Sequence, residues 1–208
     1  MKDTVQEVLN MLRGADLSSH SIDDQARLAR AFAQSLGIRS SADFSNPADI
    51  AACFSGESHA FFYSRQDSPR VKVFEERFAQ MEGGNYALAT GTGMGAIKLT
   101  CDALLEKNRS IVYSRNIFGT TTNLFEKHYP KLGFTAVPVD LVNLSMWEQR
   151  IKEHRPSIVF LETPSNPKTE LGDIAEISKI ARVYDAKFVV DSTFSSPIYQ
   201  HPLILGQM

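Results

Sequence analysis

Between residues 86 and 191 the chain alternates short apolar runs with longer stretches of helical pattern, and the connections are brief. Parallel strands need a crossover of this kind, so the alternation predicts a mainly parallel sheet with helices on both faces. The expected strands are YALAT (86–90), SIVYS (110–114), TAVPVD (135–140), SIVFLE (157–162) and KFVVD (187–191). The predicted fold class is therefore α/β, with a mainly parallel sheet and flanking helices.

Helices are predicted between these strands and upstream of them. Apolar residues at spacings of three and four, with glycines at helix ends, mark the segments. Between the strands they are GMGAIKLTCDALLE, TTTNLFEKHYPKLG, SMWEQRIKEH and DIAEISKIARVYD, and upstream they are VQEVLNML, DDQARLARAFAQSLG, SNPADIAACF and SPRVKVFEERFAQMEGG. We assign residues 1–60 to a helical N-terminal segment.

Composition and charge exclude several classes of protein. The 208 residues allow a sizeable core, and a net charge of −2 predicts neither a nucleic-acid surface nor a polybasic membrane patch. No apolar run approaches the ~20 residues of a membrane span, and the N-terminus has no signal-peptide pattern, so we expect a cytoplasmic protein. Cys53 and Cys101 lack C-x-x-C spacing and the histidines lack ligand spacing, which predicts no metal site.

Ligands of parallel α/β sheets gather at the carboxyl ends of strands, so the residues that follow each strand are site candidates. TGTGMGA follows the first expected strand and opens a helix with three glycines. Glycines let backbone N–H groups approach an anion at the positive end of a helix. The segment matches neither the P-loop nor the dinucleotide fingerprint, because Ala96 stands where the last glycine belongs. A tight strand–helix turn explains the glycines equally well.

Three other stretches carry polar candidates. In ETPSNP two prolines stiffen the loop and present Asn166, although an Asx turn explains it too. Asp191 ends the fifth expected strand, where it either caps a helix or pairs with a partner that must stay protonated, such as a heterocyclic nitrogen. In FFYSRQDSPR, Tyr63 and Arg65 share a face of an extended segment, and Arg65 suits a phosphate unless it is simply solvated.

Six motifs together resemble one enzyme family. YSRQDSP, the helix ending MEGG, ATGTGMGAI, NIFGTTTNLF, ETPSNP and VVDSTFSSP…PLILG occur in the order and approximate spacing of the Cys/Met-metabolism enzymes that use pyridoxal 5′-phosphate (PLP). That family includes cystathionine γ-synthase, cystathionine lyases, methionine γ-lyase and the O-acyl-homoserine sulfhydrylases. The resemblance covers roughly residues 43–206 and implies an aspartate-aminotransferase-like fold. Residues 61–208 would be the N-terminal part of the PLP-binding large domain, without its C-terminal part or the C-terminal domain.

The resemblance implies how the cofactor phosphate is held. Gly93 and Met94 would donate backbone N–H groups to it. Tyr63 and Arg65 would reach it from a neighbouring subunit, which makes the active site a property of an oligomer.

The resemblance also implies contacts to the cofactor ring. Asp191 would pair with the protonated pyridine nitrogen, Asn166 would hydrogen-bond the 3′-oxygen, and Thr193 would lie against the ring. Phe118 occupies the position of a stacking tyrosine, and it has no hydroxyl to act as acid or base. Glu162 would lie behind the residues that contact the cofactor.

These implications lead to a main hypothesis about function. The chain would be the N-terminal part of a transsulfuration enzyme that performs β/γ-elimination or γ-replacement on cystathionine, cysteine, methionine or O-acyl-homoserine. The family's Schiff-base lysine lies in a later segment, and no lysine follows Lys187 here, so no catalytic residue is predicted in this chain and we expect it to be inactive alone.

Two alternatives stay open. The chain could be a non-catalytic or regulatory paralogue that completes the PLP site of a partner, or a Rossmann-type nucleotide-binding module. The second explains the alternation but not YSR or ETPSNP. Under the main hypothesis the partners are a sulfur amino acid and other subunits, either as a homo-oligomer or as a hetero-oligomer, for example with a polypeptide that carries the C-terminal half. No nucleic acid or membrane partner is predicted.

Overall fold

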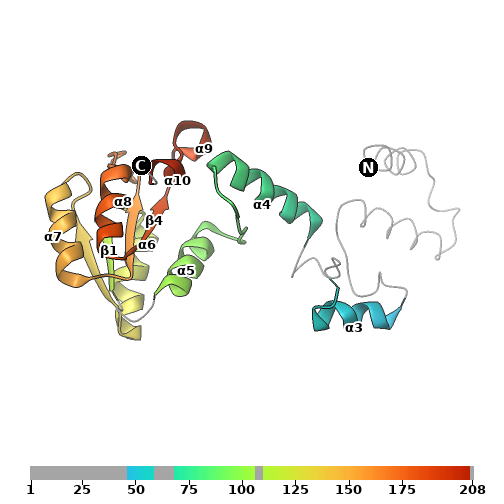
Figure 1. Cartoon of the computed structure of the whole chain (residues 1–208). Helices are drawn as coiled ribbons and strands as arrows, with labels where there is room; N and C mark the ends of the chain where they lie inside the picture. Colours follow the sequence, from blue (N-terminus) through green and yellow to red (C-terminus); the bar gives the residue numbers. More distant parts are fainter. Residues whose placement is uncertain (1–45, 59–67, 106–109, 207–208) are drawn as a thin grey trace, which may run out of the picture. The chain divides into compact units, whose positions relative to one another are not determined.

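The computed structural model describes residues 46–58, 68–105 and 110–206 (Figure 1). The chain divides into two units between Glu76 and Arg77. The helices predicted within residues 1–45, as well as Tyr63 and Arg65, lie outside the described residues.

The first unit contains the predicted helix of the SNPADIAACF segment. This helix is α3 (Pro47–Ser55). Asn46 caps it by accepting a hydrogen bond from Ala48 N at 3.0 Å, and Pro47 sits in the first turn, where its missing N–H costs nothing. Gly56 ends the helix with φ 79°, a left-handed conformation that favours glycine. Helix α4 (Pro69–Glu82) begins in this unit and continues into the second.

The second unit is built on a four-stranded parallel sheet with the order β2-β1-β3-β4. The strands are β1 (Ser110–Ser114), β2 (Thr135–Val139), β3 (Ile158–Glu162) and β4 (Lys187–Asp191), within a residue of their predicted bounds at either end. Strands β1 and β3 are central and every residue of both is buried. The register pairs Glu162 with Asp191 at the carboxyl ends of β3 and β4, so the two acids are neighbours across the ladder.

Helices cover both faces of the sheet, as the alternation predicts (Figure 1). Because successive side chains of a strand point to opposite faces, each strand contributes side chains to the hydrophobic cores on both faces of the sheet. On one face Val112, Val159 and Leu161 pack against α7 (Leu144–His154) and α8 (Ile174–Val183). On the other face Tyr113 and Phe160 pack against α5 (Gly93–Leu104) and the helical segment that follows α6 (Gly119–Asn123).

The prediction of a strand at residues 86–90 is wrong. The segment has no regular structure, and Tyr86 and Leu88 are 93% and 72% exposed. A short apolar run permits a strand, but a strand also needs a neighbour whose backbone groups pair with its own. Within the described residues this segment has no such neighbour, and the sheet has four strands rather than five.

The single helix predicted over TTTNLFEKHYPKLG is three short segments. After α6 come a π-helical turn, η3 (Leu124–His128), and a 3₁₀ turn, η4 (Tyr129–Leu132). Pro130 has no N–H, so it cannot continue the α-helical ladder, and Tyr129 N bonds instead to Leu124 O, one residue further back than in an α-helix. Two further helices that were not predicted, α9 (Ser196–Tyr199) and α10 (Pro202–Leu205), follow β4.

We expect Gly172→Ala to destabilise the second unit by about 1–3 kcal/mol, because overpacking a dense core has this cost. A Cβ at this position would lie 2.7 Å from Leu141 Cδ1 and 3.0 Å from Leu161 Cδ1, and both leucines are fully buried. Urea unfolding monitored by circular dichroism measures the change. Gly119→Ala is the matched control, since its Cβ would meet nothing within 4 Å. Equal stability of the two variants would contradict the close packing around Gly172.

Candidate functional site

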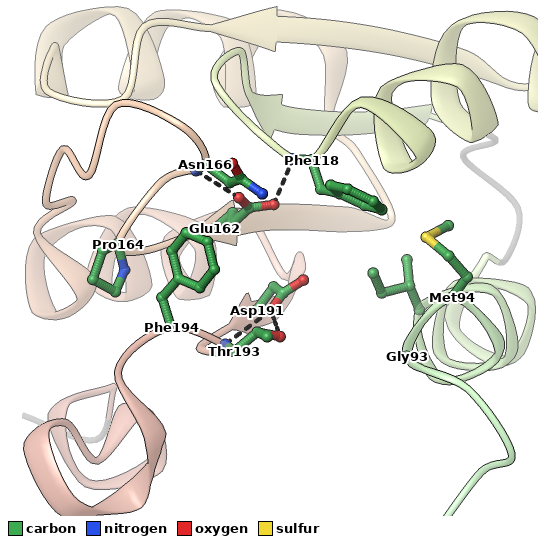
Figure 2. Close-up of a pocket in the computed structure, with 10 residues that line it drawn as sticks. Gly93, Met94, Phe118, Glu162, Pro164, Asn166, Asp191, Thr193 and Phe194 are labelled. Atoms are coloured by element: carbon green, nitrogen blue, oxygen red, sulfur yellow. Dashed lines mark hydrogen bonds between the residues drawn. The ribbon is translucent and has the colours of Figure 1, made fainter.

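A cavity of about 300 Å³ opens at the carboxyl ends of β3 and β4, at the lower end of the range of small-molecule sites (Figure 2). Every sequence-predicted site residue in the described part of the chain lines it. The lining residues are Gly93, Met94, Ile97, Phe118, Glu162, Pro164, Asn166, Asp191, Thr193 and Phe194. The structure thus brings together residues from Gly93 to Phe194, which are far apart in the sequence, while Tyr63 and Arg65 fall outside the described residues.

Three lining residues were not predicted. Ile97 lies one helical turn beyond Gly93 on α5, Pro164 belongs to ETPSNP, and Phe194 follows Thr193 directly. Each lies within or next to a motif that was recognised. Ile97 and Phe194 are apolar side chains, which sequence reasoning assigns to the core by default, so only the geometry reveals them as lining residues.

Asp191 is the last residue of β4, and the turn that follows orients its carboxylate. Its Oδ1 accepts hydrogen bonds from Thr193 N at 3.0 Å and from Thr193 Oγ1 at 2.5 Å. The alternative role of a helix cap is wrong, because Ser195 is the N-cap residue of α9. The carboxylate is therefore a fixed negative group at the floor of the cavity (Figure 2).

Glu162 is buried beside Asp191 and holds two loops. Its Oε2 accepts from Phe118 N and its Oε1 from Asn166 N, both at 2.8 Å. Burial raises the pKa of the Glu162 carboxyl above its ordinary value of 4.5, and the nearby Asp191 charge acts in the same direction. The two backbone N–H groups oppose that rise without cancelling it.

The loop after β3 presents Asn166 to the cavity. Backbone hydrogen bonds close it, from Ser165 N to Glu170 O at 3.0 Å and from Thr169 N to Ser165 O at 2.7 Å. The Ser165 hydroxyl, which is buried, also accepts from Glu170 N at 3.1 Å. Among the described residues the Asn166 side chain has no hydrogen-bond partner, so its amide is free to bind a ligand.

The glycine turn forms the N-terminus of α5. Thr92 is the N-cap residue, and its Oγ1 accepts from Gly95 N at 3.0 Å. That bond leaves the N–H groups of Gly93 and Met94 at the open start of the helix, where an anion is stabilised. A Cβ on Gly93 would meet nothing within 4 Å, so no contact among the described residues requires glycine there. The space in front of Gly93 is part of the cavity.

Two aromatic rings border the cavity. Phe118 is 44% exposed and Phe194 is 55% exposed, and both side chains border the open space (Figure 2). The backbone of Phe118 is fixed at both ends, because its N–H donates to Glu162 and its carbonyl accepts from Thr122 N at 3.0 Å. An aromatic side chain held open at a cavity suits stacking on a flat ligand.

The described residues contain no cluster of three or more His, Cys, Asp or Glu side chains that could hold a metal ion. In the same part of the chain no helix has the length and apolar character needed to cross a membrane.

Comparisons with known proteins identify relatives with this sequence and fold. The sequence profile described as "Cys/Met metabolism PLP-dependent enzyme" matches residues 19–207. O-succinylhomoserine sulfhydrylase of Pseudomonas aeruginosa is 39% identical over 83% of this chain and 43% of its own length. L-methionine gamma-lyase of Pseudomonas putida is 36% identical over 75% of this chain and 39% of its own length.

Solved structures agree with the sequence relatives. The crystal structure of cystathionine gamma synthase from Xanthomonas oryzae pv. oryzae in complex with cystathionine superposes with a TM-score of 0.68 and 32% identity. The match covers 73% of this chain and 39% of that one. The chain thus spans about two-fifths of the length of the curated relatives it matches.

We expect Glu162→Gln to lower stability by about 1–3 kcal/mol at low pH, because the hydroxyl oxygen of the protonated acid can still accept from the second backbone N–H group, whereas an amide nitrogen faces that group with a donor. The wild-type advantage should shrink as pH rises. With its pKa raised in the folded state, Glu162 keeps a proton there that the unfolded chain has already lost, so unfolding becomes easier from pH 4.5 up to the folded pKa.

Urea unfolding of both proteins from about pH 4 to about pH 8 tests this through the difference in their free energies of unfolding. Glu176→Gln serves as control, since Glu176 is exposed and pairs with Lys179 on the surface. A wild-type advantage that grows with pH would show that the two N–H groups outweigh burial.

Proposed function

The chain belongs to the Cys/Met metabolism PLP-dependent enzyme family, and on that premise we propose that it is the N-terminal part of a transsulfuration enzyme. The complete protein would act by β/γ-elimination or γ-replacement on cystathionine, cysteine, methionine or an O-acyl-homoserine. One observation carries the proposal: all the expected cofactor-binding residues in the described part of the chain line a single cavity.

The residues present fit pyridoxal 5′-phosphate. The two carboxylates of Glu162 and Asp191 are neighbours at the cavity floor, and a cationic group offsets their mutual repulsion. A protonated pyridine nitrogen is such a group, the N-terminus of α5 suits a phosphate, and Phe118 suits an aromatic ring. When bound, the cofactor supplies an electron sink that stabilises a carbanion at the substrate's α carbon.

Each side chain then has a defined task. Asp191 holds the proton on the ring nitrogen, and Asn166 binds the 3′-oxygen with its free amide. The Thr193 hydroxyl donates a hydrogen bond to Asp191, so Thr193 keeps that carboxylate in place and packs against the ring. Gly93 and Met94 bind the phosphate through their N–H groups. Glu162 has no direct part in binding the cofactor. It aligns the two loops that carry Phe118 and Asn166.

Subunit contacts and location are part of the proposal. Tyr63 and Arg65 would complete the phosphate site of a neighbouring subunit in a homo-oligomer, or in a hetero-oligomer with a polypeptide that carries the C-terminal half. We place the protein in the cytoplasm, which fits its two free cysteines. Burial raises the pKa of the Cys101 thiol to about 12, so it stays protonated and unreactive.

A second function, that of a non-catalytic subunit, is favoured by one observation. Phe118 occupies the open side of the cavity with a ring that lacks an acidic or basic group. In this role the chain would bind the cofactor without turning over substrate.

We expect the chain to bind pyridoxamine 5′-phosphate, and Asp191→Asn to weaken that binding about tenfold, because the loss of a charge partner of the ring nitrogen is worth roughly 1.4 kcal/mol. This compound has no aldehyde, so surface lysines cannot react with it. Its intrinsic fluorescence reports the titration. Asp185→Asn is the control, since Asp185 sits in a left-handed turn that asparagine tolerates. Equal affinity in all three proteins would contradict the role of Asp191.

Activity is tested by joining this chain to the C-terminal part of the O-succinylhomoserine sulfhydrylase of Pseudomonas aeruginosa. We expect the chimera to carry an absorbance band of bound PLP and to turn over at least one of the four substrate types, and the same chimera with Asp191→Ala to lose turnover. Phe118→Tyr should then raise the elimination rate by about 10²-fold, since a positioned acid or base contributes that much. Bound cofactor without turnover in the Phe118→Tyr chimera would favour the non-catalytic subunit.

A further inference from the structure

One hydrogen bond outside the cavity joins the two loops that carry its aromatic and amide groups. Asn116 Nδ2 donates to Glu170 Oε2 at 2.7 Å, and both residues are half-buried. Asn116 lies two residues before Phe118 in the turn after β1, and Glu170 lies four residues after Asn166 in the loop after β3. Neither side chain lines the cavity. The bond therefore acts on the site only through the loops.

Both ends of this bond are fixed to the fold. Glu170 is held by Ser165, whose N–H donates to Glu170 O and whose hydroxyl accepts from Glu170 N. On the other side, Arg115 N donates to Val139 O at 2.7 Å, and Ile117 is buried in the core, so Asn116 stands between two anchored neighbours. A bond between two anchored groups fixes the distance between their loops.

This bond complements the one made by Glu162. Glu162 holds the turn after β1 at the N–H of Phe118, and Glu170 holds the same turn at the side chain of Asn116. The backbone bonds of Arg115 and Phe118 hold the turn to the sheet, and the Asn116–Glu170 bond adds a direct link to the loop that carries Asn166. Because Glu162 and Glu170 are both carboxylates, the bonds that they accept are of the stronger, charge-assisted kind.

We propose that Asn116 and Glu170 form a positioning pair, which fixes the Phe118 ring and the Asn166 amide at the spacing that a flat pyridine ligand needs. This inference deepens the proposed function and rests on it for the identity of the ligand. The pair touches neither ligand nor reacting atoms, so its removal loosens the turn while the carboxylates and the helix N-terminus of the cavity stay in place.

A lysine also lies near Glu170. Lys168 Nζ lies 3.9 Å from Glu170 Oε1, and the two side chains are 58% and 37% exposed, respectively. Such an exposed pair contributes little, so the link between the loops depends on Asn116 rather than on Lys168. Lys168→Met is accordingly a control that removes a partner of Glu170 without cutting the loop-to-loop bond.

The test compares Asn116→Asp, Glu170→Gln and the double variant N116D/E170Q in the full chain. Asn116→Asp sets two carboxylates against each other and breaks the bond, whereas Glu170→Gln keeps an acceptor oxygen for Asn116. In the double variant the amide introduced at 170 donates to the carboxylate introduced at 116, which restores the bond with its polarity reversed. Hydrogen exchange of the Phe118 amide, measured by NMR, reports opening of the turn.

We expect Asn116→Asp to speed exchange at Phe118 by about tenfold, the effect of losing one hydrogen bond to a charged group, while exchange at the core residue Val112 is unchanged. Affinity for pyridoxamine 5′-phosphate should fall in parallel. Glu170→Gln and Lys168→Met should change both readouts little, and N116D/E170Q should recover both. Glu170→Ala, which removes the acceptor without adding charge, replaces Asn116→Asp if that variant does not fold.

Two results would overturn the pairing. One is unchanged exchange at Phe118 in both Asn116→Asp and Glu170→Ala. The other is an equal rise in the exchange rates of Phe118 and Val112 that N116D/E170Q does not reverse. A bond that contributes only to global stability behaves in this way. Failure of the proposed function is a separate result: the wild-type chain would not bind pyridoxamine 5′-phosphate, while exchange at Phe118 would still respond to the pair.

Discussion

The site depends on one buried carboxylate. Glu162 ends the central strand β3, and its two oxygens accept backbone N–H groups from loops that follow different strands. No hydrophobic contact has this directional effect, because each oxygen places one amide at a defined distance and angle. The same side chain thus aligns the loop that carries Phe118 and the loop that carries Asn166. A neutral amide at this position satisfies only one of them.

The general rules of parallel sheets predict the frame well. Strands β1 and β4 coincide with their predicted runs, because short apolar stretches bounded by polar turns have few alternatives. The rule that ligands gather at the carboxyl ends of strands also leads to Asn166 and Asp191, which the structure places at one cavity. Local sequence fails where an element depends on a distant partner. Residues 86–90 form a short apolar run like those of the strands, yet no neighbouring strand in the described part pairs with them.

The contacts between loops could not be predicted for the same reason. Asn116 and Glu170 are 54 positions apart, and neither belongs to a pattern that identifies the other as its partner. Glu162 was expected near the cofactor from the family resemblance, but its double acceptor role requires the three-dimensional positions of both loops. Sequence motifs therefore identify the groups that face a ligand more readily than the groups that hold them.

The adjacency of Glu162 and Asp191 gives the cavity its chemical preference. Like charges at neighbouring strand ends destabilise each other, and the raised pKa of Glu162 records part of that cost. The fold keeps both carboxylates. Glu162 accepts two backbone N–H groups, and Thr193 orients Asp191 toward the cavity. A ligand that brings a proton on a ring nitrogen to Asp191 relieves the repulsion, whereas an anionic group at the same place increases it. Together with the open helix start at Gly93, the cavity thus favours a ligand that is cationic at one end and anionic at the other.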